Sequence, residues 1–340
     1  MRAIGQDTFG GPEVLRVIEV DKPSPGPAEV LIRVHAAGVN PTDSWHRGTG
    51  GLVEAIAPLG WDVSGVVEEV GPGVTLFAPG DEVFGMPRHP HAAGTYAEYV
   101  TAPARHLAHK PANLSHVEAG ALPLVALTAW QALVDTADVR PGQRVLIHAA
   151  AGGVGHVAVQ IAKARGAYVL ATARTDNHDF VRELGADEVI DYRTTVFEEA
   201  FRDVDVVVDT IGGEYGPRSL RTLRPGGIVV SLASPAEAAL GEVARPLGLR
   251  ARFMIVEADR AGMLAVADLA ATGGLRVHVD TVVPLDLVSK AHEVSDNQRT
   301  RGKIVLAVAE DAGAQVDGRS APVGCSRSNG GQAAPRAQNL

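Results

Sequence analysis

The sequence VLIHAAAGGVGHVAVQ, residues 145–160, decides the fold. Apolar residues typical of a buried strand run into a turn of alanines and glycines, and a pattern typical of an amphipathic helix follows. As a fingerprint the segment reads Ala150-x-Gly152-x-x-Gly155, with alanine in the place of the first glycine. Gly152 lets a backbone approach a pyrophosphate closely, Gly155 lets the helix pack on the strand, and the helix N-terminus offers free amides. The segment predicts a dinucleotide site; a structural turn in an unliganded α/β domain is the alternative.

Strand-like and helix-like stretches alternate from residue 144 onward. Buried-type strands are expected at 144–148, 168–173, 188–190, 204–209 and 227–232, with helices at 155–165, 178–184 and 216–223. This alternation predicts a parallel sheet that helices cover on both faces, which is the doubly wound Rossmann arrangement.

The residues on both sides of this region have a β-rich texture. Short β-branched runs at 30–34, 63–70 and 82–84 are separated by Pro and Gly clusters, which suggests a compact barrel-like domain. A helical stretch is expected at 119–134, and β texture returns at 277–283 and 303–308. The simplest arrangement is an α/β fold in which a Rossmann domain is inserted into a discontinuous β-rich domain.

The overall composition excludes several classes of protein. The chain has 340 residues and a net charge of −9, and it lacks the basic stripe that a nucleic-acid groove needs. Its one cysteine is Cys325, which fits a reducing compartment. Neither a signal peptide nor an apolar run long enough for a membrane span is present. We therefore expect a cytoplasmic protein whose partners are neither nucleic acid nor membrane.

The end of the second expected strand indicates the type of dinucleotide. NAD enzymes place Asp or Glu there to bind the ribose 2′-hydroxyl, whereas this chain has Thr172, Ala173 and then Arg174. The fork of Arg174 can bind a 2′-phosphate as a charge-assisted pair. Arg174 as a solvated loop cation is the alternative, and Asp176 would reverse the interpretation if it belonged to the strand end. We predict NADPH (NADP) as the cofactor.

Residues 148–155, HAAAGGVG, closely resemble the zinc-independent NADPH:quinone oxidoreductases of the medium-chain dehydrogenase/reductase superfamily, which also contains the zinc alcohol dehydrogenases. Supporting stretches occur in the family's order at 39–43, 60–67, 79–83, 94–99, 184–187, 209–213 and 302–306. The resemblance covers about residues 1 to 308.

The resemblance implies a GroES-like catalytic domain, a Rossmann domain and a cofactor between them. The expected boundaries are 1–122 and 275–309 for the GroES-like catalytic domain and 123–274 for the Rossmann NADP-binding domain. Residues 310–340, rich in Gly, Ala, Ser, Gln and Arg, are expected to be a disordered tail. The resemblance also implies a homodimer joined along the Rossmann sheet edge, through residues 252–256.

The zinc ligands of the alcohol dehydrogenases are missing from this chain. Their Gly-His-Glu motif is Gly60-Trp61-Asp62 here, and the first 324 residues contain no cysteine, so a four-cysteine structural site is excluded. A catalytic site from His46, His89, His91 and Asp62 remains formally open, but His89 and His91 are better interpreted as surface loop residues. We expect no metal.

Without a Lewis acid, hydride transfer to an electrophilic acceptor is easier than alcohol oxidation. We therefore predict an NADPH-dependent, zinc-independent oxidoreductase that delivers hydride to a quinone or an α,β-unsaturated carbonyl compound. Two alternatives stay open: an enoyl or ketoreductase of a biosynthetic pathway on the same scaffold, and a non-catalytic NADPH-binding protein.

Four residues are candidates for the catalytic site. Asn40 and Asp43 lie in the stretch that the family places beside the nicotinamide, although both residues also commonly cap helices. Trp45 stacks on a flat substrate or fills the core. His46 is a candidate proton donor, with a structural histidine as the alternative.

The expected cofactor-binding residues extend beyond the glycine turn. Thr128 matches a family position near the nicotinamide, and Tyr192 follows the third strand, near the adenosine phosphate. Relatives carry a lysine after the second strand where Asn177 or His178 stands, and Arg299 or Arg301 would replace its charge. The set comprises Thr128, Ala150, Gly152, Gly153, Val154, Gly155, Thr172, Arg174, Tyr192, Thr210, Ser231 and Arg301.

Overall fold

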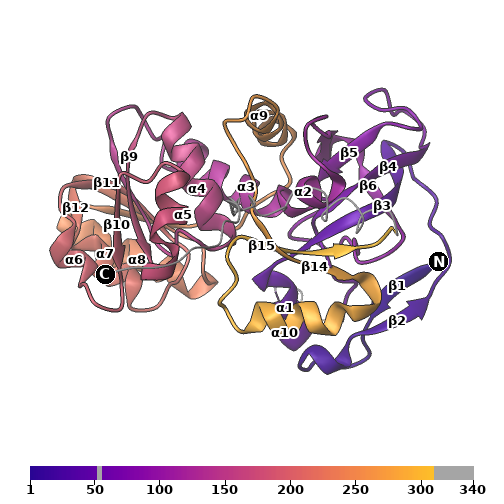
Figure 1. Ribbon diagram of the computed structural model, residues 1–340, viewed down its shortest axis with the longest axis horizontal. Helices are drawn as coiled ribbons and strands as arrows, with labels where there is room; N and C mark the ends of the chain where they lie inside the picture. The colour runs from indigo at the N-terminus through magenta and orange to yellow at the C-terminus, as the bar shows by residue number, and fades with distance from the viewer. Residues whose placement is uncertain (52–55, 310–340) are drawn as a thin grey trace, which may run out of the picture.

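The computed structural model describes residues 1–51 and 56–309. Two lobes lie side by side, one around a six-stranded sheet and one around a seven-stranded sheet (Figure 1). The expected tail, 310–340, lies outside the described residues.

The six-stranded sheet is parallel throughout, and its strand order is β10-β9-β8-β11-β12-β13. Its strands are β8 (Arg144–Ile147), β9 (Tyr168–Ala173), β10 (Glu188–Asp191), β11 (Val204–Asp209), β12 (Leu223–Ser231) and β13 (Arg250–Phe253). The chain moves outward from β8 to β10 and then returns to β11 on the other side of β8. This reversal between β8 and β11 is the position where open α/β sheets bind ligands.

Helices cover both faces of this sheet. They are α3 (Pro123–Trp130), α4 (Gly153–Ala164), α5 (His178–Glu183), α6 (Phe197–Ala200), α7 (Tyr215–Leu220), α8 (Leu240–Ala244) and α9 (Arg260–Ala271). Because strand side chains alternate between faces, Val145 and Ile147 share one apolar cluster with α3 and α4, whereas Leu146 belongs to a second cluster on the other face. The doubly wound arrangement predicted from the sequence is confirmed.

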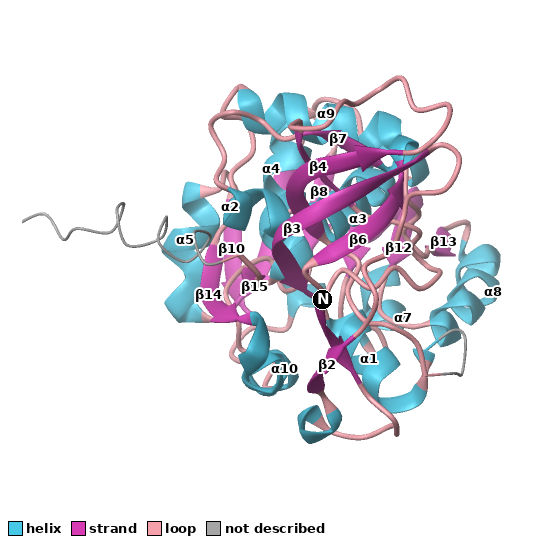
Figure 2. Ribbon diagram, turned by 90° about the vertical axis from the view of Figure 1, so that its right-hand side faces the viewer, coloured by secondary structure: helices cyan, strands magenta, loops and turns pink. Residues whose placement is uncertain are grey.

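The seven-stranded sheet combines strands that precede the Rossmann unit in the sequence with strands that follow it. It consists of β3 (Glu29–Val39), β4 (Val63–Val70), β5 (Glu82–Gly85), β6 (Tyr99–Pro103), β7 (Leu107–His109), β14 (Val279–Pro284) and β15 (Lys303–Ala307). A separate hairpin pairs β1 (Arg2–Gly5) with β2 (Arg16–Glu19). β15 lies between β14 and β3, with Ile304 opposite Val39, and Figure 2 shows the three strands together. The Rossmann unit is therefore inserted into the β-rich unit, as predicted; the residue boundaries at 122 and 275 stay a prediction.

Three further helices belong to or border this lobe: α1 (Pro41–Thr49), α2 (His116–Ala121) and α10 (Val288–Asp296). The helix predicted over 119–134 is divided into α2, α3 and a π-helical turn, Gln131–Thr136. The division falls at Pro123, which lacks an amide hydrogen and is therefore placed at the first position of a new helix.

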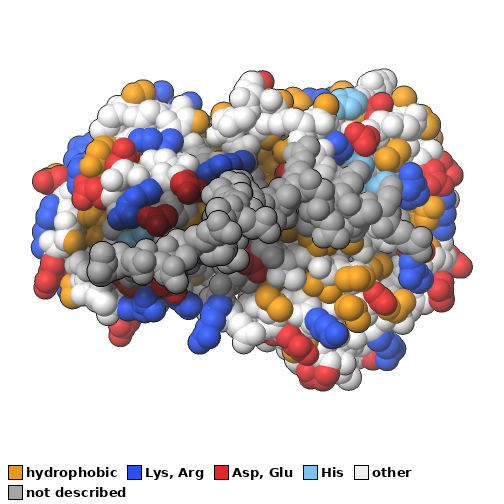
Figure 3. All heavy atoms as spheres, viewed as in Figure 1, with side chains coloured by type: hydrophobic (Ala, Val, Ile, Leu, Met, Phe, Trp, Pro, Cys, Tyr) orange, Lys and Arg blue, Asp and Glu red, His pale blue; other side chains and the backbone are white. Residues whose placement is uncertain are grey.

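The surface carries charges of both signs. On the face seen in Figure 3, Lys and Arg side chains are interspersed with Asp and Glu. No helix in the described part of the chain is long and apolar enough to cross a membrane.

Candidate active site

The glycine turn between β8 and α4 has little room for side chains. Gly152 is the N-cap of α4, and no side chain from the described residues caps this helix. A Cβ on Gly155 would lie 2.3 Å from the carbonyl oxygen of Ala149 and 2.7 Å from the Cα of Ala150. The first amides of α4, from Gly153 and Val154 onward, thus remain available to an anionic ligand at the positive end of the helix dipole. The turn fits the pyrophosphate of a dinucleotide.

Hydrogen bonds from other segments hold this turn. The Ala150 amide donates to the Thr172 carbonyl at 3.0 Å, and the Gly302 amide donates to the Ala151 carbonyl at 2.9 Å. Thr172 is fully buried, and its hydroxyl accepts from the Ala149 amide at 3.3 Å. The structure therefore places Thr172 behind the turn as a support; a contact between Thr172 and the cofactor stays a prediction.

Arg174 and Tyr192 lie next to each other at the ends of neighbouring strands. Arg174 follows β9 and Tyr192 follows β10, and the Arg174 Nε donates to the Tyr192 hydroxyl at 3.2 Å. Asp176 lies beyond β9, in the 3-10 turn Thr175–Asn177, and it is exposed. The end of β9 thus carries the cation, as the sequence analysis assumed, and not a carboxylate.

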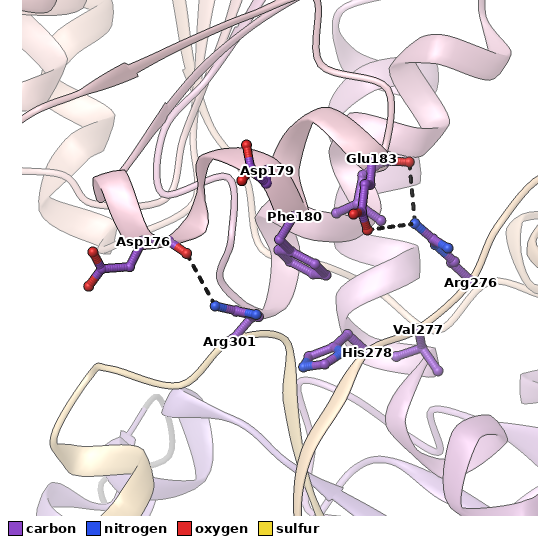
Figure 4. Close-up of a pocket in the computed structure, with 9 residues that line it drawn as sticks. Asp176, Asp179, Phe180, Glu183, Arg276, Val277, His278 and Arg301 are labelled. Carbon is purple, nitrogen blue, oxygen red and sulfur yellow. Dashed lines mark hydrogen bonds and ion pairs between the residues drawn. The ribbon is translucent and has the colours of Figure 1, made fainter. Parts of the chain in front are cut away.

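Arg301 reaches the same loop from the β-rich lobe. Its Nε donates to the Asn177 side-chain oxygen at 2.9 Å, and another guanidinium nitrogen donates to the Asp176 carbonyl at 3.4 Å. Figure 4 shows Arg301 beside Phe180, where it lines a cavity of about 440 Å³ between α5 and the strand region near His278. Arg301 therefore supports the loop after β9; its contact with a cofactor stays a prediction.

Three hydroxyl residues lie near the carboxyl ends of the central strands or on α3. The Thr210 hydroxyl donates to the His148 carbonyl at 3.2 Å, and the Thr128 hydroxyl donates to the Leu124 carbonyl at 2.7 Å. Ser231 ends β12, and its buried hydroxyl has no partner among the described residues. Of the three, Ser231 has the most hydrogen-bonding capacity left for a ligand.

Asn40 and Asp43 form the capping box of α1. The Asn40 amide donates to the Asp43 carboxylate at 2.7 Å, and the second Asp43 oxygen accepts from the Gly60 amide at 3.1 Å. The Asn40 side-chain nitrogen donates to Asp62 at 2.9 Å, and its side-chain oxygen accepts from Lys303. Both residues are fully buried, so the structure gives them the capping role. A contact with substrate stays a prediction.

Lys303 is the residue that the sequence analysis missed. Its ammonium donates to the Val39 carbonyl at 3.0 Å and pairs with Asp62 at 3.3 Å, and Asp62 also accepts from the Leu124 amide at 2.6 Å. The Lys303 side chain is 2% exposed and that of Asp62 is 0% exposed. A lysine at the start of the apolar strand KIVLA was the available signal, because a lysine is rarely buried without a partner.

Asn40, Asp43, Asp62 and Lys303 form a buried cluster, and burial raises the pKa of its two carboxyl groups. Removal from water raises the pKa of Asp43 to about 7, and the nearby charge of Asp62 adds to the effect. Burial also raises the pKa of Asp62, while Lys303 opposes the shift. The cluster therefore contains a carboxyl group, Asp43, that changes its protonation near neutral pH.

Trp45 and His46 follow on α1. His46 Nδ1 donates to the Thr42 carbonyl at 2.9 Å, and its buried Nε2 has no partner among the described residues. Burial lowers the pKa of His46, so the ring is neutral with its proton on Nδ1. In this tautomer Nε2 is an acceptor; the proton-donor role of His46 stays a prediction. Trp45 is 40% exposed and presents an aromatic surface at the same helix.

The residues at the position of the Gly-His-Glu motif of the zinc alcohol dehydrogenases, and the histidines near it, make other contacts in the structure. Trp61 is buried and donates its indole hydrogen to the His91 carbonyl at 2.8 Å. His91 is exposed, as predicted, but the prediction that His89 lies on the surface is wrong, because His89 is only 8% exposed. Its Nδ1 bonds the Val256 carbonyl at 2.8 Å, and burial lowers its pKa to about 4. Within residues 1–51 and 56–309, no three His, Cys, Asp or Glu side chains converge on one point. The donor set does not fit a catalytic zinc.

Known proteins are similar to this chain in sequence and in fold. Residues 26–112 match the alcohol dehydrogenase GroES-like domain, and residues 184–306 match the zinc-binding dehydrogenase family. The mitochondrial NAD(P)H oxidoreductase RTN4IP1 of Danio rerio is 33% identical over 332 residues, which cover 84% of this chain and 85% of that protein. The chain belongs to the quinone oxidoreductase-like family of the medium-chain dehydrogenase/reductase superfamily.

Other members of this family match over most of their length. The 2-haloacrylate reductase of a Burkholderia species is 36% identical, over 87% of this chain and 96% of that enzyme. The structure of the quinone oxidoreductase from Coxiella burnetii superposes with a TM-score of 0.86 at 36% identity, over 91% of this chain and 99% of that chain. This protein is therefore an oxidoreductase of a pyridine-nucleotide-binding family, as the sequence predicted.

Proposed function

We propose that this protein uses NADPH, without zinc, to reduce a quinone or an α,β-unsaturated carbonyl compound. The observation that carries the proposal is the uncapped glycine turn at the start of α4, with Arg174 at the end of the neighbouring strand. The similarity to a quinone oxidoreductase and to a 2-haloacrylate reductase supports the class of acceptor.

Each part of the cofactor would be bound by a different group of residues. Amides of Gly153 and Val154 would bind the pyrophosphate, and Arg174 with Tyr192 would bind the 2′-phosphate. The nicotinamide end would lie near Thr128, Thr210 and Ser231, at the carboxyl ends of the central strands. Bound NADPH supplies the hydride.

Side chains of α1 would bind and orient the acceptor. The exposed ring of Trp45 offers a surface on which a planar quinone or enone can stack. An acceptor of this kind is already electrophilic, so the missing zinc ligands are no obstacle, and the anion formed by hydride addition takes its proton from solvent. His46 stays neutral beside this surface, and its Nε2, which has no partner among the described residues, can accept a hydrogen bond.

Steady-state oxidation of NADPH and NADH with quinones, enones and an enoyl thioester tests the proposal. The variant Arg174→Met should raise the KM for NADPH about 10- to 100-fold and leave that for NADH nearly unchanged, because a hydrogen bond to a charged group is worth about 1.5–3 kcal/mol. Arg182→Met is the matched control, because Arg182 is an exposed arginine on α5 that pairs with Asp179.

The outcomes separate the alternatives. Equal weakening of both dinucleotides in Arg174→Met would count against the 2′-phosphate role. A strong preference for the thioester would favour a biosynthetic enoyl reductase. NADPH binding without turnover of any acceptor would favour a non-catalytic binding protein.

We also propose a homodimer through the edge of the Rossmann sheet. β13 is the last strand of that sheet, and its outer side pairs with no strand in the described part of the chain. A charge reversal at the exposed Arg252 of β13, Arg252→Glu, should turn a dimer into monomers in analytical ultracentrifugation. A monomeric wild type would refute this arrangement.

A further inference from the structure

Ala149 adopts an unusual backbone conformation inside the glycine turn. Its φ is +48°, in the left-handed region that residues with a Cβ rarely adopt. Its carbonyl oxygen accepts from the Gly152 amide at 2.9 Å and lies where a Cβ on Gly155 would clash. The conformation of Ala149 therefore determines where the turn and the first amides of α4 lie.

A buried chain of hydrogen bonds ends at the amide of Ala149. That amide donates to the Thr172 hydroxyl at 3.3 Å, the hydroxyl contacts His148 Nδ1 at 3.2 Å, and His148 Nε2 contacts the Ser219 hydroxyl at 3.0 Å. Because the Thr172 oxygen accepts from the amide, its own hydrogen is free to donate to His148 Nδ1. The proton of His148 then lies on Nε2 and is donated to Ser219.

The surroundings exclude water from these hydrogen bonds and determine the direction in which each one is donated. Thr172, His148 and Ser219 are all 0% exposed. The rings of Phe197 and Tyr215 meet the imidazole edge-on, at centroid distances of 4.6 and 5.0 Å. Burial lowers the pKa of His148 to about 3, so the imidazole is neutral across the physiological range and acts as one donor and one acceptor.

We propose that Thr172, His148 and Ser219 are positioning residues of the cofactor site, which hold Ala149 in its left-handed conformation and so aim the turn amides at the pyrophosphate. This inference rests on the proposed NADPH binding. This series of hydrogen bonds connects three neighbouring elements, β8, β9 and α7, to Ala149. Thr172 itself was predicted to bind the cofactor; this inference gives it a supporting role behind the turn, and direct contact with the cofactor stays a prediction.

The variant Thr172→Val tests the proposal, because valine keeps the shape of threonine and removes both hydrogen bonds. We expect the Kd for NADPH, measured by fluorescence titration, to rise about tenfold. Tenfold corresponds to about 1.4 kcal/mol, which is the size of the cost of the left-handed region for a residue with a Cβ. The kcat at saturating NADPH should change less than about twofold, because the acceptor site is untouched.

A second substitution should reverse the defect. In Thr172→Val/Ala149→Gly, glycine adopts the positive φ without help, so the NADPH affinity should return to within about threefold of the wild type. Glycine at other positions lowers stability, so a general structural role for Thr172 predicts no such rescue. Ser219→Ala, at the far end of the chain, should raise the Kd less than Thr172→Val and keeps the test open if the latter fails to fold.

Thr222→Val is the matched control. Thr222 is also fully buried, and its hydroxyl donates to the Ser219 carbonyl at 2.8 Å without reaching the turn. It should lower the unfolding midpoint and leave the Kd for NADPH unchanged. An unchanged Kd in both Thr172→Val and Ser219→Ala, or no rescue by Ala149→Gly, overturns the inference. A wild type that binds neither NADPH nor NADH overturns the proposed function itself.

Discussion

Replacing Lys303 with methionine tests how much the buried cluster contributes to stability. The change keeps the length of the side chain but leaves the Asp62 carboxylate, at 0% exposure, without its cation. The Val39 carbonyl and the Asn40 side-chain oxygen lose their donor as well. Removing one partner of a buried ion pair costs about 3–5 kcal/mol, so we expect the free energy of unfolding to fall by about 4 kcal/mol.

Urea unfolding followed by tryptophan fluorescence measures this loss, because Trp61 is buried next to Asp62 in the sequence. The double variant Lys303→Met/Asp62→Asn removes both charges and should lose less than half as much. Lys163→Met is the control: Lys163 pairs with Asp187 at the surface, where such a pair is worth less than about 1 kcal/mol. If Lys303→Met loses under about 1 kcal/mol, or the double variant loses as much as the single one, the reasoning is refuted.

Three further predictions concern the turn, the buried carboxyl group and the metal. Gly155→Ala places a Cβ 2.3 Å from the Ala149 carbonyl oxygen, so NADPH affinity should fall at least about tenfold in calorimetry; unchanged affinity would show that the turn does not hold the dinucleotide. The folded protein raises the pKa of Asp43 from 3.8 to about 7 and so keeps a proton that the unfolded chain releases. By this group alone, stability falls as pH rises from about 4 to about 7, and Asp43→Asn should flatten that part of a plot of urea midpoint against pH; an identical slope in the variant would contradict the shift. A chelator should leave the NADPH oxidation rate unchanged, and activity lost to the chelator and restored by zinc would reject the metal-free site.

Local chemistry made the Rossmann half predictable. The pattern of strand, glycine turn and helix is written in consecutive residues, and β9 (Tyr168–Ala173) and β11 (Val204–Asp209) begin and end where the sequence placed them. That Arg174 and Tyr192 lie close together also follows from the sequence, because parallel strands bring their carboxyl ends to one edge of the sheet.

Contacts between distant residues were not predictable in this way. Asn40, Asp62 and Lys303 are separated by 22 and 241 positions, and sequence spacing does not tell which buried positions face one another. The sequence also could not show that the Thr172 side chain lies behind the glycine turn, for a related reason. The end of a strand is readable from the sequence, but the face to which one side chain points depends on packing.

The position of β15 has a consequence for how the protein is made. When a growing chain has passed residue 271, all six strands of the nucleotide-binding sheet and the helix α9 that covers it exist, and that unit can fold independently. The first domain must wait about thirty residues longer, until Lys303–Ala307 emerge and cover the open stretch of β3 at 36–39. The amino-terminal domain of this protein is therefore begun first but completed last.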